Sequence, residues 1–278
     1  MFGLAFILLS IIVSEWVKSN GGAMRVMLCC LLLLSSAFSA AEEALQIAVA
    51  SNFTSTMQQL AVQFEQQTGH RTTVSYASTG KLFAQISNGA PFDLLLAADR
   101  ARPRRLESLG LIAPGKRFTY AKGEVVLWAP HAHSTEEALQ QLQQGDFNYL
   151  AIANPKIAPY GAAAMETMAK LGINNRYMKR IARGENIAQT YQFVYSGNAE
   201  MGFVAKSQVV AAGDALRGVV WQVPRDMYTS IEQQAVLLKR AEDNPVAHAF
   251  FDFLSGEVAQ KTIAATGYNL ISPIASSY

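Results

Sequence analysis

The sequence predicts an α/β protein in which parallel sheets are covered by helices. Strand and helix signals alternate along the chain from residue 45 onward, as is typical of βαβ units. One strand signal, FDLLLAA at positions 92–98, is apolar apart from Asp93, and such runs belong to strands that are buried on both faces. At four points, a helix signal follows the end of a strand signal with only a few polar, Gly or Pro residues between them.

The first part of the predicted domain contains three strands, each followed by a helix. The apolar residues Phe53, Met57, Leu60 and Phe64 recur at helical spacing behind the first strand, and a glycine closes that helix. The second helix ends at the turn sequence NGAP, and Pro103 opens the third. The expected strands are 45–50, 72–76 and 92–98, and the expected helices are 53–69, a short helix through 82 and 86, and 103–110.

The second part continues the alternation with strands at 124–130 and 149–155 and a helix at 134–145. Further helices are expected to begin at Pro159 and near Ile187, and two final helices, at 244–256 and 258–268, should pack on the first lobe. The chain is expected to leave the first lobe near Gly123 and to return near Pro224. The first lobe would then consist of two chain segments, with the second lobe inserted between them. The predicted division is 42–123 plus 227–278 for lobe 1 and 124–226 for lobe 2.

The N-terminal segment 1–41 is predicted to be a signal peptide rather than part of the folded body. Met24 and Arg25 precede a short apolar run that ends in small residues, with cleavage sites after Ser39 or Ala41, which is the pattern of a secretory leader. The run from residue 26 to 34 is too short to span a membrane. A second apolar run lies upstream, and the preferred interpretation is that Met24 is the true start.

Composition limits the function classes that the mature chain can belong to. Removal of residues 1–41 removes both cysteines, Cys29 and Cys30, and with them any disulfide or thiolate chemistry. The remaining 237 residues carry 21 basic and 20 acidic side chains, and this near-neutral balance does not favour nucleic-acid binding. A secreted chain without cysteines suits a bacterial periplasm.

The four strand-to-helix junctions are the candidate functional feature. In a parallel α/β sheet such junctions lie at the carboxyl ends of the strands, where these folds bind their ligands. Each helix start presents backbone N–H groups without partners and a partial positive charge, so several of them together can hold an anion without lysine or arginine. The junctions are Ser51-Asn52, Ser78-Thr79-Gly80, Pro159-Tyr160-Gly161 and Gly184-Glu185-Asn186.

Each junction taken alone fits an ordinary helix cap, because Ser, Thr and Asn are common capping residues. Two junctions in each predicted lobe favour a shared anion site instead. Sequence alone does not determine whether they converge.

Other candidate sites are weaker. His131 and His133 flank an alanine in an expected loop, and a solvated pair is preferred over a metal site because no cysteine or carboxylate motif accompanies them. Asp93 and Asp99 flank one strand, and their spacing separates them by about 20 Å, which argues against an acid/base pair. The arginine-rich segment 100–107 is interpreted as a solvated face or a docking surface.

Five stretches of the sequence together resemble periplasmic molybdate-binding proteins, the solute receptors of ABC-type molybdate transporters. They occur in the family's order and spacing between Leu45 and Tyr268, which is nearly the whole mature chain. The stretches are VASNFTSTMQQLAVQFEQQTG, SYASTGKLFAQISNGAPFDLLLAAD, ANPKIAPYGAAA, GENIAQTYQFVYSGNAEMGFVAKS and GEVAQKTIAATGY.

The resemblance implies the two-lobed periplasmic-binding-protein (type II) fold, with an oxyanion between the lobes. It implies that Ser51 and Asn52 at the first junction and Ser78 and Thr79 at the second bind the ligand. In the second lobe it implies the same role for Tyr160 and for the backbone N–H of Ile187. One branch of the family has a tyrosine after the strand MGFV; this chain has Ala205 there, so Ala205 is not expected to bind.

The resemblance implies that the protein binds molybdate, and also tungstate, and delivers it to an inner-membrane ABC permease. The expected receptor is a periplasmic monomer that is not an enzyme, needs no cofactor and holds the metal only as its oxyanion, without direct metal ligands. The junctions contain no acidic residue except Glu185 and no obvious side-chain acceptor except Asn52, which weakly favours molybdate, tungstate or sulfate over phosphate. Two alternatives stay open: a receptor for another oxyanion such as sulfate, and a secreted serine hydrolase that uses Ser51 or Ser78.

Overall fold

The computed structural model describes residues 44–173 and 175–271, which all belong to one compact unit, Ala44–Tyr278. The predicted signal peptide, its alternative start at Met24 and both cysteines lie outside the described residues. Among the residues that are described, no helix has the length and apolar character needed to cross a membrane.

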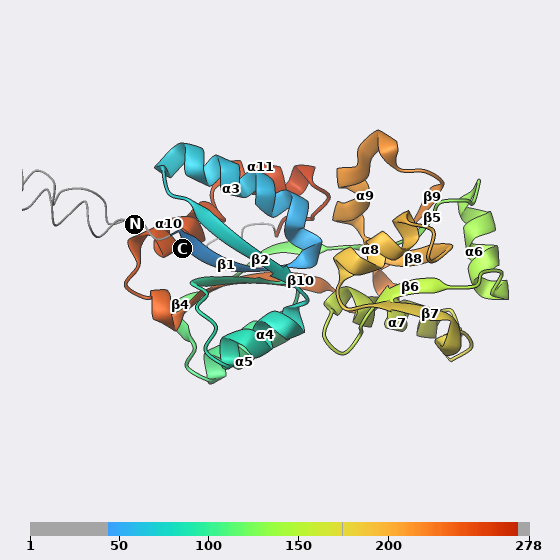
Figure 1. The fold of residues 1–278 in the computed structure, drawn as a ribbon, viewed down its shortest axis with the longest axis horizontal. Helices are drawn as coiled ribbons and strands as arrows, with labels where there is room; N and C mark the ends of the chain where they lie inside the picture. Colours follow the sequence, from blue (N-terminus) through green and yellow to red (C-terminus); the bar gives the residue numbers. More distant parts are fainter. Residues whose placement is uncertain (1–43, 174, 272–278) are drawn as a thin grey trace, which may run out of the picture. The chain divides into compact units, whose positions relative to one another are not determined.

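The first of two five-stranded sheets defines the first lobe (Figure 1). Strand β1 pairs in parallel with β2 and β3, whereas β10 pairs antiparallel with β3 and β4. In sheet order the strands are β2 (Thr72–Ala77), β1 (Leu45–Ala50), β3 (Leu94–Ala97), β10 (Ile231–Leu238) and β4 (Ile112–Gly123).

Helices cover both faces of this sheet, because its central strands are apolar on both sides. Val49 and Leu96 pack with α3, α10 and α11 in one core, while Ala48 and Leu95 pack with α4 and α5 in another. Figure 1 shows these helices on opposite faces. Their bounds are α3 (Thr54–Thr68), α4 (Thr79–Ser87), α5 (Ala101–Ser108), α10 (Pro245–Phe253) and α11 (Glu257–Ala265), with short turns η1 (Ser51–Phe53) and η5 (Lys239–Ala241).

The second sheet defines the second lobe and repeats the same plan. Strand β6 pairs in parallel with β7 and β8, and β5 pairs antiparallel with both of its neighbours, β8 and β9. In sheet order the strands are β7 (Ile181–Gly184), β6 (Leu150–Ala153), β8 (Met201–Ala205), β5 (Val125–Ala129) and β9 (Val219–Gln222). The helices are α6 (Thr135–Gln144), α7 (Pro159–Lys170), α8 (Ile187–Tyr195) and α9 (Lys206–Ala212), with turns η2 (Met178–Arg180), η3 (Gly213–Ala215) and η4 (Arg225–Met227).

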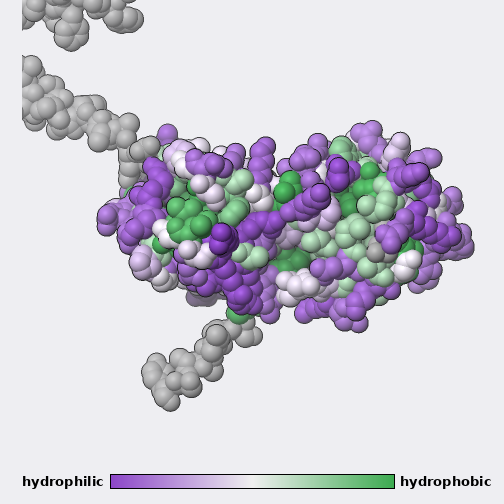
Figure 2. Space-filling view, turned by 90° about the horizontal axis from the view of Figure 1, so that it is seen from below, coloured by the Kyte–Doolittle hydropathy of each residue, from purple (hydrophilic) through white to green (hydrophobic). Residues whose placement is uncertain are grey.

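Two separate cores again lie on the two faces of the second sheet. Leu127 and Ile152 face α6 and α7, and Val126 and Ala151 face α8. The space-filling view shows mainly hydrophilic residues on the face seen from below in Figure 1, with apolar residues in scattered patches (Figure 2). The apolar runs of the sequence lie mainly in the four cores between the sheets and their helices.

Strands β4, β9 and β10 have no counterpart among the elements expected from the sequence. In β4 the strand signal is interrupted by Pro114 and by Gly115, which has φ +71°. Proline is tolerated there because β4 is an edge strand, where fewer ladder hydrogen bonds are lost. Strand β10 contains the polar run Glu232, Gln233 and Gln234, so the sequence did not predict a buried strand there.

The chain changes sheets twice, at places near those expected. Strand β4 ends at Gly123 and β5 begins at Val125, while the return lies between the end of β9 and the start of β10. On this basis we propose the division 42–123 plus 227–278 for the first lobe and 124–226 for the second. The final helices α10 and α11 pack in the core of the first lobe.

Candidate functional site: a neutral cavity between four helix starts

Four helix starts follow the carboxyl ends of parallel strands, two in each lobe. In the first lobe η1 follows β1 directly, and Ser78 alone separates β2 from α4. In the second lobe α7 follows β6 after a short loop, and α8 follows β7 after two residues. Because parallel strands end at the same edge of a sheet, both helix starts of each lobe lie at one edge.

All six residues predicted for the site line one cavity between the lobes. The cavity is small, with an empty volume of about 190 Å³ that includes its opening to solvent. The six residues are at most 4% exposed, so the cavity suits a small ion that is taken out of water. The lining residues are Ala50, Ser51, Asn52, Ala77, Ser78, Thr79, Ala98, Ala158, Pro159, Tyr160 and Ile187.

The lining residues are all neutral, and the cavity offers many hydrogen-bond donors. The N–H groups of Ser51, Asn52, Thr79, Tyr160 and Ile187 lie in the first turns of their helices, where a helix has no acceptor for them. The helix dipoles add partial positive charge at the same point. This donor set favours an anion over a cation or an uncharged ligand.

Ser51 is not a helix cap, contrary to the simplest interpretation of the first junction. The N-cap positions of η1 and α3 are Ala50 and Phe53, and neither helix start has a side-chain cap. Ser51 instead lies inside η1, where its carbonyl accepts a hydrogen bond of 2.9 Å from Thr54 Oγ1. The 3₁₀ turn thus holds the buried side chain of Ser51 at the cavity, and this side chain does not cap a helix.

The hydroxyl of Ser78 is a buried donor without a partner. Ser78 occupies the N-cap position of α4 but makes no side-chain cap bond, and its Oγ has no hydrogen bond to any other described residue. A buried unsatisfied hydroxyl is costly, so the Ser78 hydroxyl in this wall is a candidate donor to a ligand. The neighbouring Thr79 Oγ1 accepts from the N–H of Ala98 at 3.0 Å, which gives Thr79 a structural role as well.

The side chain of Asn52 points its amide group into a buried network. Both hydrogens of its Nδ2 are engaged, with Gln233 Oε1 at 2.9 Å and the Tyr268 hydroxyl at 3.0 Å. The carbonyl of Asn52 accepts from Ser207 Oγ at 2.9 Å, across the lobe boundary. The donor that Asn52 has left for a ligand is its backbone N–H.

The wall in the second lobe is formed by Tyr160 and Ile187. Gly161 lets α7 approach β6 closely, because a Cβ there would lie 2.1 Å from the carbonyl oxygen of Ala153. Burial, reinforced by the neighbouring tyrosines, raises the pKa of Tyr160 well above its ordinary value, so its phenol keeps its proton as a donor. Ile187 begins α8, whose N-cap Asn186 accepts from the N–H of Gln189 at 3.0 Å.

The two lobes touch beside the cavity. The N–H of Gly80 in α4 donates to the carbonyl of Ile157 in the second lobe at 2.9 Å, and Arg102 Nη2 reaches the carbonyl of Lys156 at 3.0 Å. The described structure is therefore a closed arrangement, with the cavity walled by both lobes.

The weaker candidates from the sequence lie elsewhere. His131 and His133 are exposed in the loop before α6. Asp93 accepts from the N–H of Gln46 and pairs with Arg240. Asp99 accepts from the N–H of Arg102 in the first turn of α5 and also pairs with that arginine. Within the arginine-rich segment, Arg100 pairs with Glu232.

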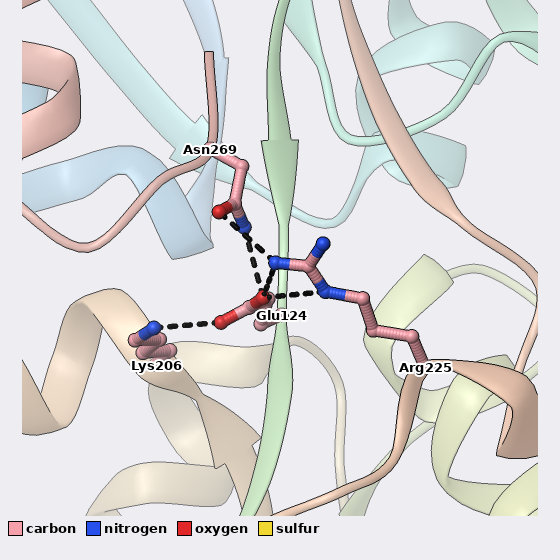
Figure 3. A network of polar contacts seen from close by, with 4 residues as sticks. All are labelled: Glu124, Lys206, Arg225 and Asn269. Carbon is pink, nitrogen blue, oxygen red and sulfur yellow. Dashed lines mark hydrogen bonds and ion pairs between the residues drawn. The ribbon is translucent and has the colours of Figure 1, made fainter. Parts of the chain in front are cut away.

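A charged cluster joins the two crossings between the lobes (Figure 3). Glu124, at the first crossing, accepts from Lys206 at the start of α9 and from Arg225 at the second crossing, at 2.7 and 2.6 Å. Asn269, near the end of the described chain, donates to the same carboxylate at 2.9 Å. Burial opposes the charged form, but these hydrogen bonds outweigh it and lower the pKa of Glu124 below 4.5.

We expect Glu124→Gln to destabilise the fold by about 1–2 kcal/mol at pH 7, because charge-assisted hydrogen bonds to one carboxylate are weakened. The lowered pKa means that this contribution is fully present above pH 4.5 and is lost as the pH falls through the folded-state pKa. Urea unfolding at pH 7 and below pH 4 should show the difference between variant and parent shrinking. Glu65→Gln, which breaks the exposed Glu65–Arg71 pair, should change little at either pH; equal effects of both variants would contradict this role.

Similarity to known proteins extends over nearly all of the described chain. Residues 45–269 match the family described as "Bacterial extracellular solute-binding protein". The chain is 47% identical over 226 residues to the molybdate-binding protein ModA of Azotobacter vinelandii, covering 81% of this chain and 90% of that protein. It is 41% identical over 221 residues to the molybdate-binding protein ModA of Rhodobacter capsulatus, covering 80% and 86%.

A solved structure shows the same fold. The periplasmic molybdate-binding protein of Azotobacter vinelandii aligns with a TM-score of 0.77 and 37% identity, covering 82% of this chain and 99% of that one. The likeness spans both lobes and confirms the predicted α/β fold with two lobes and a sheet flanked by helices in each.

Proposed function

The chain belongs to the bacterial extracellular solute-binding proteins, as a molybdate-binding component of an ABC transporter, and we propose that it holds the oxyanion in the neutral cavity between its lobes. The proposed donors of the first lobe are the hydroxyls of Ser51 and Ser78 and the N–H groups that begin η1 and α4. Those of the second lobe are the hydroxyl and N–H of Tyr160 and the N–H of Ile187. Asn52 contributes through its backbone, since its Nδ2 has other partners. Thr79 keeps its hydroxyl proton as a further donor, because its Oγ1 only accepts from the N–H of Ala98.

The observation that carries this proposal is the unpaired hydroxyl of Ser78. It lies in the wall of a small neutral cavity whose other polar groups are helix-start N–H groups and phenol or hydroxyl donors. An oxyanion would satisfy this hydroxyl and the N–H groups at once, with no counter-charge needed. A cation would find no carboxylate among the lining residues.

The donor set favours a fully ionised tetrahedral oxyanion. A ligand that carries a proton also needs an acceptor, and no carboxylate lies among the lining residues to supply one. Molybdate and tungstate both meet this requirement, so we propose that both bind. Phosphate, which is protonated near neutral pH, should bind much less well.

Closure of the lobes is the proposed mechanism of capture. Each lobe contributes part of the donors, so the anion stabilises the closed state only when both walls meet. The Gly80–Ile157 hydrogen bond forms in the same state. Delivery to an inner-membrane ABC permease, from a monomer in the periplasm, is the proposed next step. Members of this family bind solutes rather than convert them, so the hydrolase alternative is set aside.

We expect molybdate and tungstate to raise the melting temperature of the mature chain, because they bind only the folded state. At a ligand concentration of 100 times the dissociation constant the gain is about 2.7 kcal/mol, or about 5–10 °C for a chain of this length. The measurement is a thermal-shift panel of molybdate, tungstate, sulfate and phosphate, followed by calorimetry. Tight binding of sulfate with none of molybdate would overturn the ligand and support the sulfate alternative.

A further inference from the structure

A single buried amide, that of Gln233, contacts residues of the cavity wall in both lobes. Gln233 lies on β10 and is fully buried. Its Oε1 accepts from Asn52 Nδ2 at 2.9 Å and from the Tyr120 hydroxyl at 3.0 Å. Its Nε2 donates to the Tyr160 hydroxyl at 3.3 Å. Asn52 belongs to the first lobe and Tyr160 to the second, so this side chain spans the boundary beside the cavity.

The orientation of the Gln233 amide determines which of its neighbours donate a hydrogen bond and which accept one. An amide oxygen accepts two hydrogen bonds and an amide nitrogen only donates, so the two accepted bonds saturate Oε1. Tyr160 accepts from Nε2, which leaves the proton of its own hydroxyl for another acceptor. Burial raises the pKa of Tyr160, so that proton is retained.

The backbone at the first crossing is shaped to admit these two side chains. A Cβ at position 123 would lie 2.1 Å from the Tyr160 hydroxyl and 2.7 Å from Gln233 Nε2. Gly123 is therefore the residue that allows Tyr160 and Gln233 to meet where the chain passes between the sheets. The sequence pattern marked this glycine only as a crossing.

We propose that Gln233 is a positioning residue of the anion site, which orients Asn52 of the first lobe and turns the Tyr160 hydroxyl proton of the second lobe toward the ligand. The inference rests on the proposed function, because it assigns Gln233 a role in binding at that same cavity. Gln233 does not line the cavity and acts through its two partners. It thereby links ligand binding to β10, the strand that returns from the second lobe.

Gln234 supplies a matched control in the next position of the same strand. It is also a buried glutamine, at 3% exposed, but its amide bonds Arg117 at 3.2 Å and Thr119 at 3.1 Å, within the first sheet. Methionine approximates the volume of glutamine and removes its hydrogen bonds. Gln233→Met loses three buried hydrogen bonds and Gln234→Met loses two partly buried ones, so urea unfolding measures the stability cost of each variant separately from its effect on binding.

The test is calorimetry of molybdate binding to the mature chain and its variants, alongside urea unfolding without ligand. We expect Gln233→Met to weaken binding about tenfold and Gln234→Met to leave it unchanged. In a Tyr160→Phe background the effect of Gln233→Met should fall below about threefold, a coupling that a merely structural role would not produce. Gln233→Glu serves if the methionine variant fails to fold: a carboxylate there accepts the Tyr160 proton, so binding should weaken more strongly.

Equal affinities of Gln233→Met and Gln234→Met, or a loss that Tyr160→Phe leaves unaltered, would overturn the inference. Failure of the parent chain to bind molybdate would overturn the proposed ligand instead. The same comparison then uses whichever oxyanion of the panel binds, and it still decides the role of Gln233. Absence of all oxyanion binding would overturn both.

Discussion

Replacing Ser51 and Ser78 together by alanine is expected to weaken molybdate binding by about 100-fold or more and to remove the ligand-induced rise in melting temperature. Each hydroxyl donates to an ionised ligand in the proposed site, and a hydrogen bond to a charged group is worth about 1.5–3 kcal/mol. Losing two such bonds therefore costs at least two factors of ten. Calorimetry and thermal shift on the double variant measure this directly.

The same substitution should leave the ligand-free protein as stable as before, or slightly more stable. The Ser78 hydroxyl is buried and has no partner within the described chain, so its removal relieves a desolvation penalty. Ser51 does not cap its helix, so alanine loses no capping bond. Weaker binding together with unchanged or higher stability of the ligand-free protein distinguishes a ligand donor from a structural hydroxyl, whose loss would lower that stability.

A matched control lies a few residues from each position. Ser55 on α3 and Ser75 on β2 are partly buried and exposed, respectively, and neither lines the cavity. The double variant Ser55→Ala with Ser75→Ala should bind molybdate like the parent. If molybdate still raised the melting temperature of the Ser51/Ser78 double variant, the proposal that this cavity is the binding site would be wrong.

Gly161→Ala is expected to destabilise the fold by about 3 kcal/mol and to weaken binding at least tenfold. A Cβ at this position would lie 2.1 Å from the Ala153 carbonyl oxygen and 2.7 Å from its carbon. Both are backbone atoms of β6, which cannot rotate away, so the start of α7 must move off the sheet by about 1 Å. That movement displaces Tyr160 from the cavity. Urea unfolding and calorimetry measure the two losses.

Gly80→Ala provides the contrast, because its clash lies between the lobes. A Cβ there would lie 2.9 Å from the Cα and Cβ of Ile157, which belongs to the second lobe. Alanine also favours the helix α4 itself, so we expect unfolding of the ligand-free protein to be unchanged or slightly harder. Binding should weaken because the closed state is opposed. If both glycine variants lost stability equally without ligand, the ligand-free protein would already be closed, and closure would not be the capture step.

Much of the architecture follows from local patterns in the sequence. Helices α3, α4, α7 and α8 begin within a few residues of the positions that periodicity, Pro159 and the polar junctions predict. The largely apolar stretch at 92–98 contains β3, which is buried on both faces. Strand β4 escapes prediction because Pro114 and Gly115 are turn signals everywhere except at an edge such as this one.

The sequence by itself determined the alternating α/β order and the residues at the four junctions, because periodicity and helix-start preferences act over a few neighbouring positions. Only the tertiary structure decided that the six junction residues share one cavity. It also decided that Ser51 is free of capping while the amide of Asn52 is occupied by Gln233 and Tyr268, at separations of 181 and 216 residues. Contacts over such separations depend on how two sheets pack and where the chain crosses between them, which no local pattern encodes.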